Sequence, residues 1–143
     1  MSIVVDAIAD LPRLVRTVLV TQMAVAAAFV VVVLLYVLRM VTAGVGPAEM
    51  VSGAYDPKDL VPFGLHAANP FFWLYAVISV VYLMGAAFTV PMAVYAVAVA
   101  ARDADRISRR IRTLLLLGAG TTTLLLLARL TPAVADMHRW WLD

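Results

Sequence analysis

The sequence predicts an all-α integral membrane protein with three transmembrane helices, its N-terminus inside the cell and its C-terminus outside. Of the 143 residues, 64% are hydrophobic and only 14% are charged. Soluble domains carry about 25% charged residues, so a bilayer is the expected solvent. Apolar runs long enough to cross about 30 Å of hydrocarbon occur three times. We expect spans at about 17–40, 71–101 and 113–133, within a single membrane domain of residues 1–143.

The first span is predicted between Arg16 and Arg39, which enclose 22 residues without a charge. At 1.5 Å per residue this run extends about 33 Å. A cleaved signal peptide has a shorter apolar region of about 7–15 residues, so the run is interpreted as a retained signal-anchor. Asp6 and Asp10 lie one helical turn apart, which predicts a short interfacial helix over residues 2–16.

The second span follows Asn69-Pro70, a pair typical of a helix N-cap followed by proline at the first helical position. No charge occurs before Arg102, which gives an uninterrupted helix of about 46 Å. This length exceeds the hydrocarbon core, so the helix must tilt, bend or project from it. Pro91 removes a backbone donor and crowds the preceding turn, and a bend is therefore predicted there.

The third span, residues 113–133, contains Arg129, the only ionisable residue well inside a predicted span. An arginine this near the outer end can extend its side chain to the headgroups. Alternatively, Asp56, Asp59 or Asp136 could form a salt bridge with it. A role facing a partner or ligand is the remaining interpretation.

The distribution of charge predicts the orientation. The connection 102–112 is rich in arginine, and the positive-inside rule places it in the cytoplasm. The segment 46–69 is net acidic and is expected to form an outer loop. Exposed arginines can also attract anionic lipid or a cytosolic partner, although a purely topological role is the simpler interpretation. The candidate residues for such contacts are Arg102, Arg106, Arg109, Arg110 and Arg112.

The second span carries small and weakly polar residues at helical spacing. Such residues favour helix contacts in lipid because they allow close approach and hydrogen bonds between helices. Matching small residues occur on the first span at Ala24 and Ala28, and on the third at Gly118 and Thr122. The predicted helix-packing or partner interface consists of Tyr75, Ser79, Tyr82, Ala86 and Thr89.

Few residues could support chemistry. There is no cysteine and no phosphate-binding, nucleophile or metalloprotease motif. His66 and His138 both fall on the outer side, where they are expected to be surface residues. Trp140 and Trp141 suit an interfacial anchor. The sequence therefore predicts no enzyme activity, metal or other cofactor, and no nucleic-acid binding.

Residues 69–130 run from a proline-led helix with a Tyr82-Leu83 pair near its middle, through an Arg-rich turn, into a span rich in Leu and Gly. This stretch resembles the later helices of uncharacterised actinobacterial multi-span membrane proteins. Ten arginines against one lysine fit the compositional bias of a GC-rich genome, such as an actinobacterial one. The resemblance carries over no functional residue. We expect a multi-pass protein of a bacterial inner or plasma membrane.

Three helices form a thin bundle, and no reactive group is visible. We therefore expect a small non-catalytic accessory or scaffolding subunit of a larger membrane complex, in a respiratory or transport setting, with membrane lipids and other integral subunits as partners. One alternative is a homo-oligomeric channel or holin-like pore, lined by Thr121, Thr122, Thr123 and Arg129. Another is a membrane-bound regulator whose Arg-rich turn binds a cytosolic protein.

Overall fold

The computed structural model describes residues 13–142, and the regular elements in that part of the chain are all helical. They are α2 (Arg13–Ala43), α3 (Pro47–Met50), the 3₁₀ helix η1 (Pro57–Leu60), α4 (Pro70–Arg102), α5 (Arg109–Ala128) and α6 (Pro132–Leu142). The interfacial helix predicted for residues 2–16 falls mainly outside the described residues.

Three of these helices, α2, α4 and α5, are long and apolar enough to cross a membrane. They contain 31, 33 and 20 residues, which correspond to about 46, 50 and 30 Å of helix. The prediction of three apolar helices of spanning length is therefore confirmed. Helix α4 continues through Pro91 without a break in its assignment.

The start of α4 is fixed by the predicted cap. Asn69 is 2% exposed, and its side-chain oxygen accepts a hydrogen bond of 3.0 Å from the N–H of Phe71. Its amide nitrogen donates bonds of 2.6 Å to the carbonyls of Pro62 and Gly64. One side chain thus ends the loop 46–69 and begins the helix, with Pro70 at the first helical position.

The predicted third span, 113–133, runs past the end of its helix, because α5 covers Arg109–Ala128 and a separate helix, α6, begins at Pro132. Arg129 is the C-cap residue, and its N–H donates to the carbonyls of Leu125 and Leu127. A proline disfavours helical geometry in the residue before it, so the chain turns ahead of Pro132. The proline then occupies the start of α6, where its missing N–H costs no hydrogen bond.

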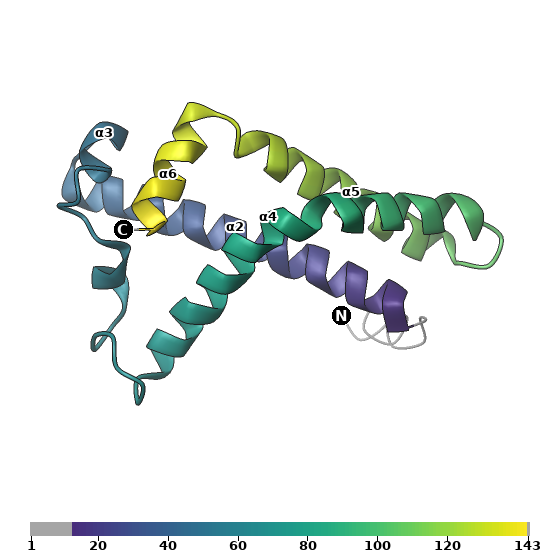
Figure 1. Cartoon of the computed structure of the whole chain (residues 1–143), viewed down its shortest axis with the longest axis horizontal. Coiled ribbons are helices and arrows are strands. Elements are labelled where there is room, and N and C mark those ends of the chain that lie inside the picture. The colour runs from purple at the N-terminus through teal and green to yellow at the C-terminus, as the bar shows by residue number, and fades with distance from the viewer. Residues whose placement is uncertain (1–12, 143) are drawn as a thin grey trace.

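The helices α2, α4 and α5 contact one another in pairs and form the body of the molecule. One end carries the start of α2 and the turn between α4 and α5, and the other carries α3, η1 and α6 (Figure 1). Helix α6 folds back and contacts α2 and α3. The predicted outer loop 46–69 therefore includes two short helices and lies at the same end as the C-terminus.

The buried residues form two clusters, one near each end. The cluster at the α6 end, which we call the aromatic cluster, contains Ala28, Phe29, Val32, Tyr36, Met50, Tyr82, Met137, Trp140 and Trp141. The second cluster is aliphatic and contains Val15, Val18, Leu19, Ala96, Ile111, Leu115 and Ala119. Aromatic packing therefore joins α6 to the long helices, whereas small and branched residues hold the other half together.

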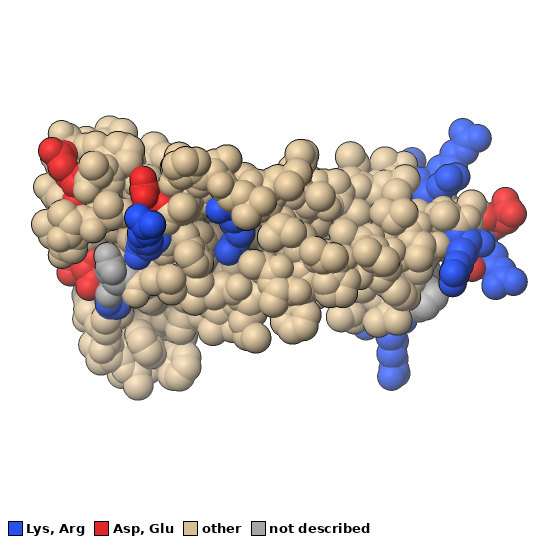
Figure 2. Space-filling model, turned by 45° about the horizontal axis from the view of Figure 1, so that its top comes forward, with Lys and Arg blue, Asp and Glu red and all other residues tan. Residues whose placement is uncertain are grey.

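Charged residues gather at the two ends and leave the apolar middle nearly free of them (Figure 2). The end formed by the α4–α5 turn is dominated by basic side chains, which all belong to arginines. The opposite end carries Glu49, Asp56, Asp59 and Asp136, and basic side chains lie among its acids (Figure 2).

Candidate functional site

Arg129 links all three long helices. From the end of α5, its Nη2 donates a hydrogen bond of 2.5 Å to the backbone carbonyl of Tyr82 on α4. Its guanidinium carbon lies 4.3 Å from the centroid of the Tyr82 ring and 5.8 Å from that of Phe29 on α2. A desolvated cation–π contact is worth about 2 kcal/mol, so this side chain also holds the bundle together.

The salt bridge considered for Arg129 is absent from the described part of the chain, where no carboxylate lies within 4.0 Å of it. Two of the acids considered as its partners pair with other cations instead. Asp56 lies 3.2 Å from Lys58, and Asp136 lies 3.6 Å from Arg139. Aromatic faces and a backbone carbonyl therefore accommodate the Arg129 cation.

The prediction that Trp140 and Trp141 form an interfacial anchor is wrong, because α6 turns its apolar face inward. Their side chains are 0% and 3% exposed. Trp140 Nε1 donates a hydrogen bond to the carbonyl of Tyr55, and its ring lies 5.2 Å from that of Tyr36. Trp141 lies 5.0 Å from the ring of Tyr75. The two tryptophans therefore belong to the core.

Several polar atoms of the aromatic cluster and of its neighbour His138 are buried without a hydrogen-bond partner among the described residues. They include Oη of Tyr36 and Tyr82, Nδ1 of His138 and Nε1 of Trp141. The Tyr82 ring lies 5.8 Å from His138 and 6.2 Å from Trp141. A buried polar group without a partner costs about 1–3 kcal/mol. Since His138 has no bonded hydroxyl among these residues, the cluster lacks a formed nucleophile–base pair.

His138 is partly buried in α6, contrary to the expectation of a surface histidine. Burial lowers its pKa below the usual 6.5, and the positive charge of Arg129 lowers it further. His66, by contrast, is exposed in the loop between η1 and α4. Within residues 13–142, no group of three His, Cys, Asp or Glu side chains is placed to hold a metal ion.

The stripe predicted on α4 faces the interior of this chain's own bundle. Tyr82 is 0% exposed and Thr89 is 3% exposed, while Tyr75, Ser79 and Ala86 are half-buried. The stripe therefore packs at least in part against this chain's own helices, and a contact with a partner stays a prediction.

Sequence reasoning missed the glycine beside this stripe. A Cβ added to Gly85 would lie 2.7 Å from Cγ2 of Val25 on α2. Thr89 Oγ1 donates a hydrogen bond of 2.8 Å to the Gly85 carbonyl one turn away. Gly85 therefore marks a close contact between α2 and α4. The small-residue run Gly85-Ala86-Ala87 was the available signal.

The Arg-rich connection lies fully at one end. Helix α4 ends at Arg102, and Ser108 caps α5 by accepting a hydrogen bond of 3.3 Å from the N–H of Ile111. Arg106 forms an ion pair of 3.8 Å with Asp103. Every arginine proposed for lipid or protein contact is exposed: Arg102, Arg106, Arg109, Arg110 and Arg112.

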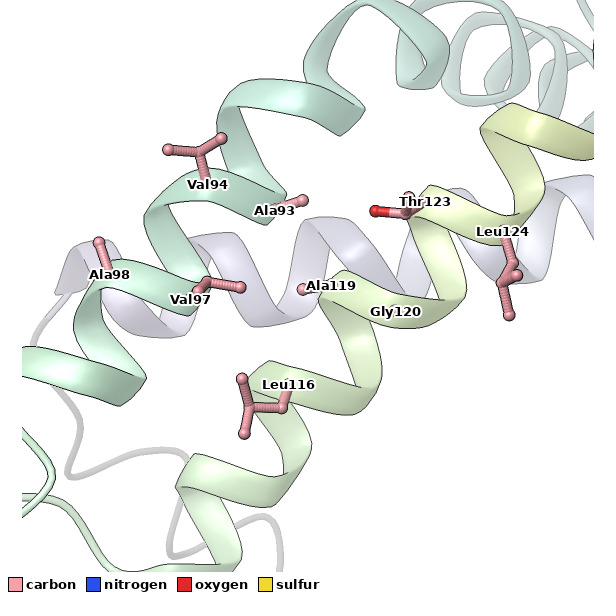
Figure 3. Close-up of a pocket in the computed structure, with 9 residues that line it drawn as sticks. All are labelled: Ala93, Val94, Val97, Ala98, Leu116, Ala119, Gly120, Thr123 and Leu124. Atoms are coloured by element: carbon pink, nitrogen blue, oxygen red, sulfur yellow. The ribbon is translucent and has the colours of Figure 1, made fainter.

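An open groove of about 800 Å³ lies on the surface between α4 and α5. Its walls contain mainly small residues, with Ala93, Val97 and Ala98 on α4 and Ala119, Gly120 and Thr123 on α5. Figure 3 shows Ala93 and Thr123 pointing toward each other across the groove, while α2 runs behind both helices. We call this hollow the α4–α5 groove.

The three threonines proposed as a pore lining face different surroundings. Thr123 lines the α4–α5 groove, whereas Thr121 lines a separate slot between α2 and α5. Thr122 is 1% exposed and donates a hydrogen bond of 2.8 Å to the carbonyl of Gly118. Consecutive residues on a helix point about 100° apart, so the three hydroxyls do not follow one line.

That slot contains a second residue missed by sequence reasoning, Gln22 of α2. Gln22 is 1% exposed, and neither Oε1 nor Nε2 has a hydrogen-bond partner within residues 13–142. Its amide lies over Gly118 of α5, where an added Cβ would come 2.5 Å from Oε1. A polar amide inside an otherwise uncharged span was the signal that should have drawn attention to it.

Comparisons of the chain with known protein families, with curated proteins and with solved structures find no match. The resemblance to actinobacterial multi-span proteins therefore stays a prediction.

Proposed function

We propose that this chain is a small, non-catalytic subunit of a larger bacterial membrane complex, and that its α4–α5 groove receives a transmembrane helix of another integral subunit. The proposal is supported by three helices of spanning length and by the open, apolar groove between two of them. We infer a respiratory or transport complex as its setting.

The charge distribution supports insertion with the N-terminus inside and the C-terminus outside. Arg13 and Arg16 lie in the first turn of α2, and the start of α2 lies at the same end of the long helices as the Arg-rich α4–α5 turn (Figure 1). The positive-inside rule assigns this end to the cytoplasm. We further propose that Pro91 bends α4, since the helix of about 50 Å exceeds the hydrocarbon thickness.

The groove supports the proposal because no described residue packs against its glycine, Gly120. A Cβ added to Gly120 would have no atom within 4 Å, whereas one added to Gly118, two residues earlier, would collide with Gln22. Glycine inside a helix costs about 1 kcal/mol relative to alanine. At position 118 a glycine is required, because a larger residue would collide with Gln22. At position 120 no contact within the described chain requires a glycine. A helix packed from outside would supply one.

The rest of the groove fits such a helix. Alanines on both walls let a second backbone approach closely, and packing between helices in lipid depends on such contacts. Thr123 offers a hydroxyl at the groove wall, and hydrogen bonds between membrane helices contribute about 0.6 kcal/mol on average. The open side faces away from α2, so an entering helix would form a fourth member of the bundle (Figure 3).

The experiment compares tagged wild-type protein with Gly120→Leu after extraction of native membranes in a mild detergent. We expect stoichiometric foreign subunits with the wild type and at least a tenfold loss of them with Gly120→Leu. Mass spectrometry identifies the subunits, and light scattering gives the mass of the complex. Unchanged recovery with Gly120→Leu would contradict the groove assignment, and a clean homo-oligomer would favour the pore alternative.

Ala27→Leu is the matched control. Ala27 is an exposed small residue of α2 outside the groove, so the same increase in size should leave recovery of the subunits unchanged. Ala27→Leu should retain wild-type thermal stability and Gly120→Leu should be at least as stable as the wild type, because both residues are exposed in this chain and leucine is the better helix former at position 120.

A further inference from the structure

Positive charge is in excess at the end of the molecule that carries the start of α2 and the α4–α5 turn (Figure 1). Asp103 pairs with Arg106 at 3.8 Å, and no other ion pair forms at this end among residues 13–142. The remaining positive charge is therefore not compensated within the described chain. Against two acids, Asp103 and Asp105, this end carries seven described arginines: Arg13, Arg16, Arg102, Arg106, Arg109, Arg110 and Arg112.

Two of these arginines continue the walls of the slot between α2 and α5. Arg16 lies three residues before the wall residue Leu19 on α2, and Arg110 lies four residues before Leu114 on α5. Residues at these spacings share one face of a helix. The slot has a volume of about 190 Å³, and its apolar wall residues include Leu19, Met23, Leu114 and Leu117.

Both arginines are free to bind an anion at the mouth of the slot. Their side chains are exposed, and neither has a carboxylate within 4.0 Å among residues 13–142. Their neighbours Val15 and Ile111 are buried together in the aliphatic cluster, so the starts of α2 and α5 are packed side by side. One helical turn, about 5 Å, separates each arginine from the slot.

We propose that the α2–α5 slot holds an acyl chain of an anionic phospholipid whose phosphate is bound by Arg16 and Arg110. Guanidinium groups pair with phosphate oxygens through two parallel hydrogen bonds, and the leucines and Met23 supply the apolar contact. A free phosphate would leave the slot unfilled, and an uncharged lipid would leave the arginines without a counter-ion. The inference rests on the proposed insertion of this chain in a membrane, but not on the α4–α5 groove.

The test is native mass spectrometry of the purified full-length chain in detergent, titrated with phosphatidylglycerol or with phosphatidylcholine of the same acyl chains. Each arginine near an anionic lipid contributes roughly fivefold in affinity. We therefore expect one saturable phosphatidylglycerol, bound about 25-fold more tightly than phosphatidylcholine. Arg16→Gln/Arg110→Gln should remove this preference. Equal binding of the two lipids to the wild type, or no saturable lipid, would overturn the proposal.

Arg112→Gln is the matched control for Arg110→Gln. Both arginines are exposed in the first turn of α5, but two residues of helix turn Arg112 about 200° away from the face of Arg110. Each variant removes one positive charge. Arg110→Gln should weaken phosphatidylglycerol binding about fivefold, and Arg112→Gln less than twofold. Equal losses would mean that the lipid responds to net charge alone, which would overturn the assignment of a site.

Ala26→Leu tests the place of the acyl chain. Ala26 lines the slot and is not fully buried, whereas its neighbour Ala27 is exposed outside it. Ala26→Leu should weaken binding of both lipids at least fivefold, and Ala27→Leu should leave it unchanged. Unchanged binding to Ala26→Leu would contradict the placement of the chain in the slot.

Competition with inorganic phosphate distinguishes a lipid from a free ion. We expect no displacement of phosphatidylglycerol at equal concentrations, and equal competition would overturn the assignment to a lipid. These titrations contain no other subunit. Their failure would therefore leave the proposed helix partner of the α4–α5 groove in place, and loss of that partner would leave the lipid site in place.

Discussion

Val25 of α2 packs directly on Gly85 of α4, so close that a Cβ on the glycine would lie 2.7 and 2.8 Å from the two methyl groups of the valine. Val25 is 5% exposed, and a β-branched side chain in a helix has essentially one rotamer. The valine therefore cannot move aside cheaply, and this contact sets the separation of the two longest helices.

Gly85→Ala should destabilise the protein by about 1–3 kcal/mol, the usual cost of overpacking. Gly120→Ala is the control, because its added Cβ meets open space and should stabilise α5 by about 0.5–1 kcal/mol. Unfolding in mixed detergent measures both free energies. Equal effects of the two substitutions would show that α2 and α4 are not in this close contact.

The Tyr82 ring, rather than its hydroxyl, should be the part that matters to Arg129. The hydroxyl is buried without a partner, whereas the ring faces the guanidinium at 4.3 Å. Tyr82→Phe should therefore change the unfolding free energy by less than about 0.5 kcal/mol. Tyr82→Leu should lose about 1–2 kcal/mol from the cation–π contact, in addition to packing. A Tyr82→Phe effect as large as that of Tyr82→Leu would reveal a bonded hydroxyl.

Two tryptophans donate hydrogen bonds to loop carbonyls, but they should differ in importance. Trp140 is fully buried and bonds to Tyr55, whereas Trp73 is 56% exposed and bonds to Ala67 at 2.8 Å. Trp140→Phe should cost about 1.5–3 kcal/mol through the lost bond and lost volume. Trp73→Phe should cost under about 1 kcal/mol. Limited proteolysis should then cut residues 44–69 faster in Trp140→Phe, and equal cutting in both variants would contradict the burial of α6.

His138 should make stability depend on pH below neutrality. Its pKa in the folded protein is lowered by burial and by Arg129, so the folded state resists protonation while the unfolded chain titrates near 6.5. The unfolded state then binds more protons, and stability falls as the pH drops below about 6.5 toward the lowered pKa. His138→Gln should flatten this part of the profile, and His66→Gln should leave it unchanged. A profile that is the same in wild type and His138→Gln would contradict the assignment.

The sequence was sufficient for the three apolar helices and for the Asn69 cap, because each has a local cause: hydropathy over about 20 residues, and one side chain next to a proline. It was not sufficient for the burial of Trp140. A tryptophan near a membrane surface and one inside a core give the same sequence pattern. Only the fold-back of α6 shows that Trp140 belongs to the core.

The candidate sites were harder to predict for a related reason. In lipid, hydropathy does not separate a face packed on another helix from one that contacts acyl chains. The spacing of small and polar residues predicts the stripe from Tyr75 to Thr89. Only the positions of α2 and α6 show that the stripe packs against helices of this chain. Gln22 stands out because it packs over Gly118 of another helix. Gly120 stands out because no atom of the described chain lies within 4 Å of a Cβ added there.

Photo-crosslinking in native membranes tests the central claim most directly. A photoreactive amino acid is placed at Val97 in the groove. The comparison is the same amino acid at Leu34 on α2, which is 62% exposed. We predict one discrete adduct with a foreign membrane protein from Val97 only, and its loss in Gly120→Leu. Adducts with lipid alone, adducts with a second copy of this chain, or equal adducts from both positions would contradict the account.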